Sequence, residues 1–292
     1  MRSLPFITLD VFTRRPLAGN QLAVFTDARG LSDAEMQAIA REMNLSETTF
    51  IFPRERSIEE ASGVKVRIFT VNEELPFAGH PTLGTAFVLR GSSGKQQIAL
   101  DLRVGKIPVR FSERQGADFG EMTQRDPEFG DIHSREQVAS VLGLSLDDLD
   151  PELPIQTVST GVAFTMVPFR SLGALRSFAL DWRRAEKYLA TSDAKFFYFV
   201  SRETESPNAR LHARMIFYNG EDPATGSAAG CTAAWLAKHG VAKPDEQVMI
   251  EQGLEAARPS EIFVRASVDA GRVSNVRVGG YTVELMRGAL TL

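Results

Sequence analysis

The feature that most constrains the fold of this 292-residue chain is an internal repeat. At an offset of 147 positions, 8 of the 24 residues in 66–89 are identical to those in 213–236. The identities include charged residues and a proline: Arg67 with Arg214, Asn72 with Asn219, Glu74 with Glu221, Pro76 with Pro223, and Gly79 with Gly226. Chance matching of small residues is the alternative explanation, but the charged matches favour duplication. The repeat predicts two similar domains, each with a strand, a loop and a helix.

Local patterns predict mixed α and β structure around the repeat. Ser32 followed by Glu35 is a capping box, so we expect a helix that ends near Asn44. Alternating or continuous apolar runs predict strands, including residues 6–12, 22–25, 49–52, 64–69, 98–104, 107–111, 162–167, 196–200, 213–217, 262–266, 273–278 and 281–285. Residues 116–131 are rich in Gly, Asp and Glu and only weakly periodic, which predicts a linker.

Composition excludes several classes of protein. The 33 basic and 37 acidic residues give a net charge of −4, which argues against a nucleic-acid-binding surface. No apolar run approaches the roughly 20 residues that span a bilayer, and the first residues do not resemble a signal peptide. We therefore expect a cytoplasmic protein without membrane partners. The single cysteine, Cys231, excludes an intramolecular disulfide and a mechanism with two thiols.

Three short segments carry residues suited to proton chemistry. Glu47 lies between a predicted helix and a strand, although a solvated loop glutamate is the ordinary alternative. His80 lies at a helix start, where the dipole favours neutral imidazole, and a helix-capping role is the alternative. Asp222 and Ser227 flank the second helix start, or simply form a capped turn. Two such helix starts facing one cleft would bind a small anionic ligand.

Motifs for other chemistry are absent from the sequence. It contains no GxxxxGK[ST] phosphate loop, no GxGxxG fingerprint and no GxSxG nucleophile elbow. Its histidines show no metal-ligand spacing such as HExxH. We therefore expect no metal site.

The ordered set of motifs resembles the PhzF family of phenazine biosynthesis isomerases, which is related to diaminopimelate epimerase and proline racemase. The resemblance covers essentially the whole chain and rests on the following blocks: 10–13, Gly19-Asn20, 40–48, 67–70, 75–84, 222–227, Gln252-Gly253 and 258–260. It implies an α+β fold of two pseudo-symmetric domains, each a curved, mostly antiparallel sheet around a central helix. The domains would comprise residues 1–118 with 280–292, and residues 119–279. It also implies a homodimer that uses no cofactor or metal.

The resemblance also implies a mechanism. The related racemases use two cysteines, whereas PhzF-like enzymes use one carboxylate, which matches Glu47. This carboxylate would move a proton in a small carboxylate substrate, as in trans-2,3-dihydro-3-hydroxyanthranilate isomerisation. His80 and Asp222 match the other catalytic positions, and substrate binding is assigned to Ser46, Gly79, Thr82, Gly226 and Ser227. The alternatives are an isomerase or epimerase of another small amino or hydroxy acid, and a metabolite-binding protein without catalysis.

Overall fold

The computed structural model describes residues 1–218 and 220–292, and the side chain of Ser92 is outside the description. The chain divides into two compact units, which are residues 1–123 with 279–292 (unit 1) and residues 124–278 (unit 2). The boundary expected at 118–119 falls inside a strand, a few residues before this division. One identity of the repeat, Asn219, lies outside the described residues.

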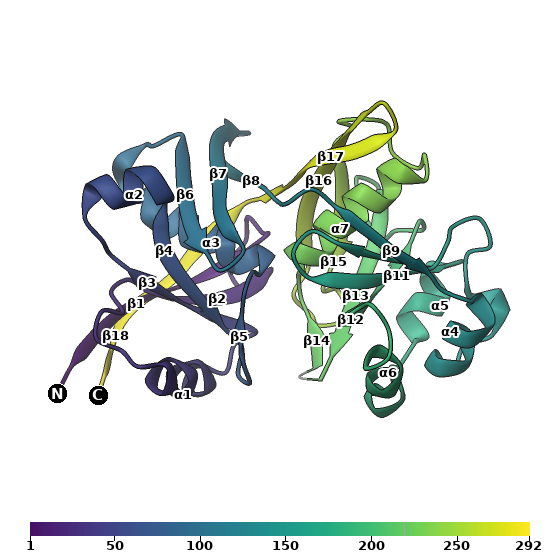
Figure 1. Ribbon diagram of the computed structural model, residues 1–292, viewed down its shortest axis with the longest axis horizontal. Helices are drawn as coiled ribbons and strands as arrows, with labels where there is room; N and C mark the ends of the chain where they lie inside the picture. Colours follow the sequence, from purple (N-terminus) through teal and green to yellow (C-terminus); the bar gives the residue numbers. More distant parts are fainter. Residues whose placement is uncertain (219) are drawn as a thin grey trace. The chain divides into compact units, whose positions relative to one another are not determined.

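Unit 1 is a curved sheet with one helix inside the curve and others outside it (Figure 1). Its strands are β1 (Ser3–Val11), β2 (Asn20–Phe25), β3 (Glu47–Phe52), β4 (Val64–Phe69), β5 (Glu74–Leu75), β6 (Gln97–Leu102), β7 (Gly105–Arg114), β8 (Ala117–Thr123) and β18 (Thr282–Thr291). Its helices are α1 (Asp33–Met43), α2 (Arg56–Ser62) and α3 (Gly79–Arg90). The two chain ends meet in this unit because β1 pairs with β18.

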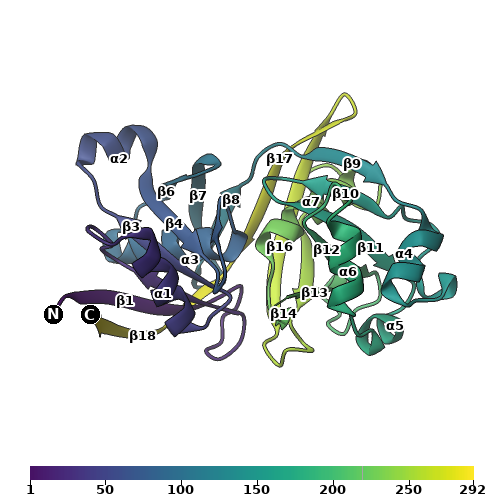
Figure 2. The same ribbon diagram turned by 60° about the horizontal axis from the view of Figure 1, so that its bottom comes forward.

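Unit 2 is built in the same way (Figure 2). Its strands are β9 (Glu128–Ile132), β10 (Gln156–Ser159), β11 (Ala163–Phe169), β12 (Phe196–Ser201), β13 (Leu211–Phe217), β14 (Gly220–Asp222), β15 (Val248–Gln252), β16 (Ser260–Asp269) and β17 (Arg272–Gly280), whose last residues belong to unit 1. Its helices are α4 (Arg135–Leu142), α5 (Leu172–Ser177), α6 (Trp182–Leu189) and α7 (Gly226–Lys238).

Strand pairing repeats between the units. In unit 1, β1 is antiparallel to β2, β2 is parallel to β3, β3 is antiparallel to β4, and β4 is parallel to β6. The same succession runs through β10, β11, β12, β13 and β15 of unit 2. The last strand of each half of the chain lies in the other unit. β9 pairs with β10 of unit 2, and β18 pairs with β1 of unit 1. The duplication expected from the sequence is therefore visible in the topology.

Each sheet buries a central helix on its concave side. α7 is buried over residues 226–236 and α3 over residues 79–86, and small side chains are required where backbone and sheet approach closely. A Cβ at Gly84 of α3 would lie 2.6 Å from Leu22 and 2.9 Å from Val11. The opposite faces of the sheets pack against the amphipathic α1 in unit 1 and against α4, α5 and α6 in unit 2. This is the mixed α/β fold expected from the sequence.

Several local predictions are confirmed and one is confirmed only in part. Ser32 caps α1 with the reciprocal Glu35 contact, and Asn44 ends that helix in the left-handed conformation. The linker expected at 116–131 is confirmed only in part: the chain passes from unit 1 to unit 2 after Thr123, but β8 and β9 occupy most of the segment. β8 pairs with β7 and buries Phe119 and Met122, so tertiary pairing overrides a weak local pattern. Among the described residues, no helix is long and apolar enough to cross a membrane.

Candidate active site

Glu47 is held at the junction of α1 and β3. The left-handed Asn44 (φ 50°, ψ 38°) ends the helix and reverses the chain. β3 then begins at Glu47, opposite Leu22 on the parallel β2. Its side chain is 14% exposed, and Ser46 next to it is half-buried. A carboxylate in this position is mostly withdrawn from water and is supported by two strands.

His80, the second residue of α3, lies against Glu47. The His80 Nε2 atom is 3.4 Å from Glu47 Oε2, and Nδ1 is 3.1 Å from the side-chain nitrogen of Asn20. Burial lowers the pKa of His80 to about 3, outweighing a backbone hydrogen bond with Gln21 that acts in the opposite direction. The imidazole is therefore neutral at ordinary pH, as expected from its place at a helix start. A carboxyl group and a neutral imidazole can share a proton-transfer reaction.

Asn20 is a site residue that the sequence reasoning did not select. It begins β2 and is 1% exposed, with its side chain against His80. Gly19 before it has φ +69°, and a Cβ there would lie 2.3 Å from the Val11 carbonyl oxygen. The buried Asp10 accepts the backbone N–H of Leu17 at 2.7 Å and so stabilises the same turn. The Gly-Asn pair was the signal available in the sequence.

Asp222 in unit 2 belongs to a second cluster of buried polar side chains. The Thr225 hydroxyl donates to Asp222 Oδ2 at 2.6 Å. The side chain of Gln252 contacts both residues, and the Tyr198 hydroxyl donates to Gln252 Oε1 at 2.8 Å. Tyr198 and Gln252 are fully buried, whereas Asp222 and Thr225 are each 8% exposed. Burial, followed by the charge of Asp222, raises the pKa of Tyr198, so this phenol remains a donor.

The two helix starts differ in how they are held. Among the described residues, no side chain caps the first turn of α3 or α7. In α3 the buried Thr82 hydroxyl donates to the Ala78 carbonyl at 2.6 Å, so it is used within the helix. In α7 the Gln124 amide donates to the Gly226 carbonyl at 2.9 Å, and Ser227 is 7% exposed. Backbone N–H groups at such starts suit an anionic ligand.

Cys231 is a packing residue in α7. Its thiol is fully buried, and burial raises its pKa to about 11, so it is not a thiolate at ordinary pH. One residue before it, a Cβ at Gly230 would lie 1.9 Å from Gln124 Oε1. This glycine therefore makes room for Gln124. Among the described residues, no group of three His, Cys, Asp or Glu side chains is arranged to hold a metal ion.

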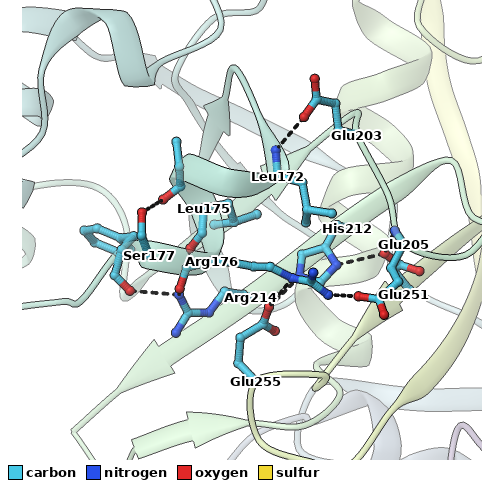
Figure 3. A network of polar contacts seen from close by, with 12 residues as sticks. Leu172, Leu175, Arg176, Ser177, Glu203, Glu205, His212, Arg214, Glu251 and Glu255 are labelled. Atoms are coloured by element: carbon cyan, nitrogen blue, oxygen red, sulfur yellow. Dashed lines mark hydrogen bonds and ion pairs between the residues drawn. The ribbon is translucent and has the colours of Figure 1, made fainter.

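A further ionic cluster in unit 2 joins β13 and β15 to α5 and to neighbouring loops (Figure 3). His212 Nδ1 is 2.8 Å from Glu251 and Nε2 is 3.0 Å from Glu255. Burial alone would lower the pKa of His212, but the hydrogen bonds with the two carboxylates raise it. Arg176 joins Glu255 to Glu205 in the same cluster. Both ring nitrogens face carboxylates, so imidazolium is the favoured form.

Comparison with known proteins identifies relatives over the whole chain. Residues 9–288 match the family described as phenazine biosynthesis-like protein. An uncharacterised isomerase of Mesorhizobium japonicum is 37% identical over 99% of both chains. The trans-2,3-dihydro-3-hydroxyanthranilate isomerase of Pseudomonas chlororaphis is 35% identical over 98% of this chain and 99% of its own. The crystal structure of a PhzF-family phenazine biosynthesis protein from Bacillus anthracis matches 100% of both chains at 26% identity, with a TM-score of 0.88.

Proposed function

Because this chain belongs to the phenazine biosynthesis-like (PhzF) family and is an isomerase, we propose that it moves a proton within a small carboxylic acid. The substrate that we propose is trans-2,3-dihydro-3-hydroxyanthranilate. Three relatives that are 34–35% identical to the chain are isomerases of that compound. The reaction is a 1,3-hydrogen shift, which needs a base and an acid but no net change in oxidation state.

The pairing of Glu47 with a neutral His80 supports this proposal. The Glu47 carboxylate takes the proton from the ring carbon that bears it, and the same carboxyl group returns a proton to a carbon further along the diene. His80 Nε2 is 3.4 Å from the carboxylate, and we place the negative charge that develops on the substrate near this nitrogen. Since burial keeps the pKa of His80 near 3, the imidazole acts as a neutral hydrogen-bonding group and not as a fixed cation.

Substrate binding is assigned to the two helix starts. We propose from the duplicated sequence and the family that one substrate lies in a cleft between the domains, with its carboxylate at one helix start. The contacts would come from Ser46 and Gly79 on one side and from Gly226 and Ser227 on the other, with Asp222 orienting the substrate. Thr82 uses its hydroxyl within α3, so we assign it to support of that helix start.

The test is turnover of the dihydroanthranilate, followed by absorbance and product analysis. Glu47→Gln should abolish turnover while the protein stays folded and still binds the compound. Glu42→Gln, on the exposed side of α1, is the matched control and should retain the wild-type rate. Undiminished turnover by Glu47→Gln would contradict the assigned role. Binding without turnover by the wild type would contradict the proposed substrate and favour another small amino or hydroxy acid.

Two further properties are proposed from the family. The reaction needs no cofactor, so activity should survive exhaustive dialysis against a metal chelator. The protein forms a homodimer, which light scattering of the purified chain would test. A monomeric mass at working concentration would contradict the second proposal.

A further inference from the structure

The hydrogen bonds around Gln252 have a fixed direction. A glutamine amide offers two acceptor sites on oxygen and two donor hydrogens on nitrogen. Gln252 Oε1 accepts from the Tyr198 hydroxyl at 2.8 Å and from the Thr225 backbone N–H at 3.1 Å. Gln252 Nε2 donates to the Asp222 carbonyl at 2.8 Å and to the Thr225 hydroxyl oxygen at 2.9 Å. All four positions are used, so the amide has one orientation.

This orientation decides where the Thr225 proton points. The Asp222 carbonyl can only accept, and the Thr225 backbone N–H can only donate, so the amide cannot be reversed without losing both bonds. The Thr225 hydroxyl accepts from Gln252, and its own hydrogen is therefore directed to Asp222 Oδ2 at 2.6 Å. A hydrogen bond donated to a carboxylate stabilises its ionised form and holds it in one position.

The backbone beside Gln252 supports the same loop. Gly253 has φ +80°, and a Cβ there would lie 2.4 Å from the Pro223 carbonyl oxygen and 2.5 Å from that of Arg258. The Arg258 N–H also donates to the Gly253 carbonyl at 2.9 Å. Gln252 and Gly253 thus contact the chain between Asp222 and Thr225 through side chain and backbone. In unit 1 the positions that match Asp222 and Thr225 in the repeat are Leu75 and Ala78, so this network is particular to unit 2.

We propose that Gln252, oriented by Tyr198, is a positioning residue that directs the Thr225 hydroxyl to Asp222 and so presents the Asp222 carboxylate ionised and in one orientation to the substrate. Its catalytic consequence rests on the role of Asp222 in the proposed function. Its structural consequence, the direction of the Thr225 hydrogen bond, does not depend on that role.

The test uses Thr225→Val and Thr225→Ser as a matched pair, with Gln252→Glu as the second variant. Valine has the shape of threonine without the hydroxyl, and serine keeps the hydroxyl. In Gln252→Glu, the new carboxylate cannot donate to Thr225 and competes for its hydrogen. Carbon-13 NMR of the Asp222 carboxyl, assigned by its loss in Asp222→Asn, follows the ionisation of this group in each full-length variant.

The proposal expects the Asp222 pKa to rise in Thr225→Val and in Gln252→Glu and to stay near the wild-type value in Thr225→Ser. With the dihydroanthranilate, kcat/KM should fall roughly 10- to 100-fold in the first two variants, the loss expected for one hydrogen bond to a charged group. Thr225→Ser should recover most of the rate. The decline of kcat/KM at low pH should shift to higher pH in Thr225→Val and Gln252→Glu, but not in Thr225→Ser.

An unchanged Asp222 titration in folded Thr225→Val or Gln252→Glu would overturn the proposal. An equal loss of rate at every pH, with wild-type titration, would also overturn it, because only general structural damage remains as a cause. If the wild type does not turn over the dihydroanthranilate, the proposed function fails, but the NMR titration still decides whether Gln252 directs the Thr225 hydrogen bond.

Discussion

The starts of α3 and α7 occupy matching positions in the repeat but carry different chemistry. The start of α3 has the buried His80 in contact with Asn20 and Glu47. The start of α7 has Ser227 at the position that matches His80. In the loop before α7, Asp222 is held by hydrogen bonds with Thr225 and with Gln252 of β15. One half therefore places a carboxyl group beside a neutral imidazole, and the other holds a carboxylate in one orientation.

The scaffold beneath these starts is the same in both units. Arg67 makes a two-pronged ion pair with Glu74 at 2.8 and 2.7 Å, and Arg214 makes the same pair with Glu221, both at 2.8 Å. Each pair joins the strand before the central helix to the next short strand. The comparison teaches that a duplicated framework keeps the residues that shape the loop and varies the side chains at the start of the central helix.

The largest expected difference between the halves is in activity. His80→Ala should lower kcat about 10²- to 10⁴-fold, the range for loss of an acid–base group, because Glu47 loses its neutral partner. Ser227→Ala, at the matching position of α7, should lower it only about 10-fold. Steady-state kinetics with the dihydroanthranilate measures both, and circular dichroism checks that each variant is folded. Equal losses of kcat in the two variants would show that the two helix starts do not differ in their contribution to catalysis.

Removing the framework arginines should affect stability unequally. Arg214 is 8% exposed and also donates to the carbonyls of Leu175 and Phe178, whereas Arg67 is 20% exposed. Arg214→Met should cost about 3–5 kcal/mol, as expected when one partner of a buried pair is removed, and Arg67→Met should cost less. Chemical denaturation gives both values. The exposed Arg56→Met serves as control, and a larger loss for Arg67→Met would reverse the comparison.

The units should also differ in how their stability depends on pH. Hydrogen bonds with Glu255 and Glu251 outweigh burial and raise the folded-state pKa of His212. The imidazolium therefore stabilises the fold fully below the unfolded pKa of about 6.5, and this contribution is lost as pH rises through the higher folded value. The matching position in unit 1 is the exposed Lys65.

Thermal unfolding measured from below the unfolded-state pKa of His212 to above its folded-state pKa tests whether His212 causes this pH dependence. His212→Gln should flatten the decline on the alkaline side, and Lys65→Gln should leave it as in the wild type. A wild-type slope in His212→Gln would show that another group is responsible.

The smallest expected difference concerns two threonines at matching positions of the central helices. Thr85 shares a buried hydrogen bond with Thr49 at 2.9 Å, so Thr85→Val removes a partner of a buried hydroxyl and should cost about 1–3 kcal/mol. Thr232 donates to the Ala228 carbonyl at 2.9 Å, within its own helix, so Thr232→Val should cost less than about 1 kcal/mol. Denaturation midpoints distinguish the two, and equal costs would remove this difference between the helices.

Local signals predicted the parts of the fold that depend on neighbouring residues. The capping box at Ser32 and the glycine that opens each central helix are read within a few positions. β10 was missed because Gln156 and Thr157 are polar yet buried, and only the assembled sheet supplies their partners. The linker prediction was too long because β8 is stabilised by its pairing with β7.

The candidate site shows the same limit. Glu47, His80 and Asp222 were selected from their motifs, but most of the residues around them lie far along the chain. Asn20 is 60 positions from His80, and Tyr198 is 54 positions from Gln252. Such contacts follow from strand order and register, which a single sequence does not display. The Gln252-Gly253 pair was noted in the sequence, and its use in holding the Asp222 loop required the structure.

The most direct test of the central claim is solvent deuterium incorporation by wild type and Glu47→Gln. The dihydroanthranilate is incubated with each protein in D₂O, and deuterium at the ring carbon that receives the proton is measured by mass spectrometry. The account predicts rapid incorporation with the wild type and a rate at least about 10³-fold lower with Glu47→Gln, because no other group moves the proton. Incorporation by Glu47→Gln at the wild-type rate would contradict the account.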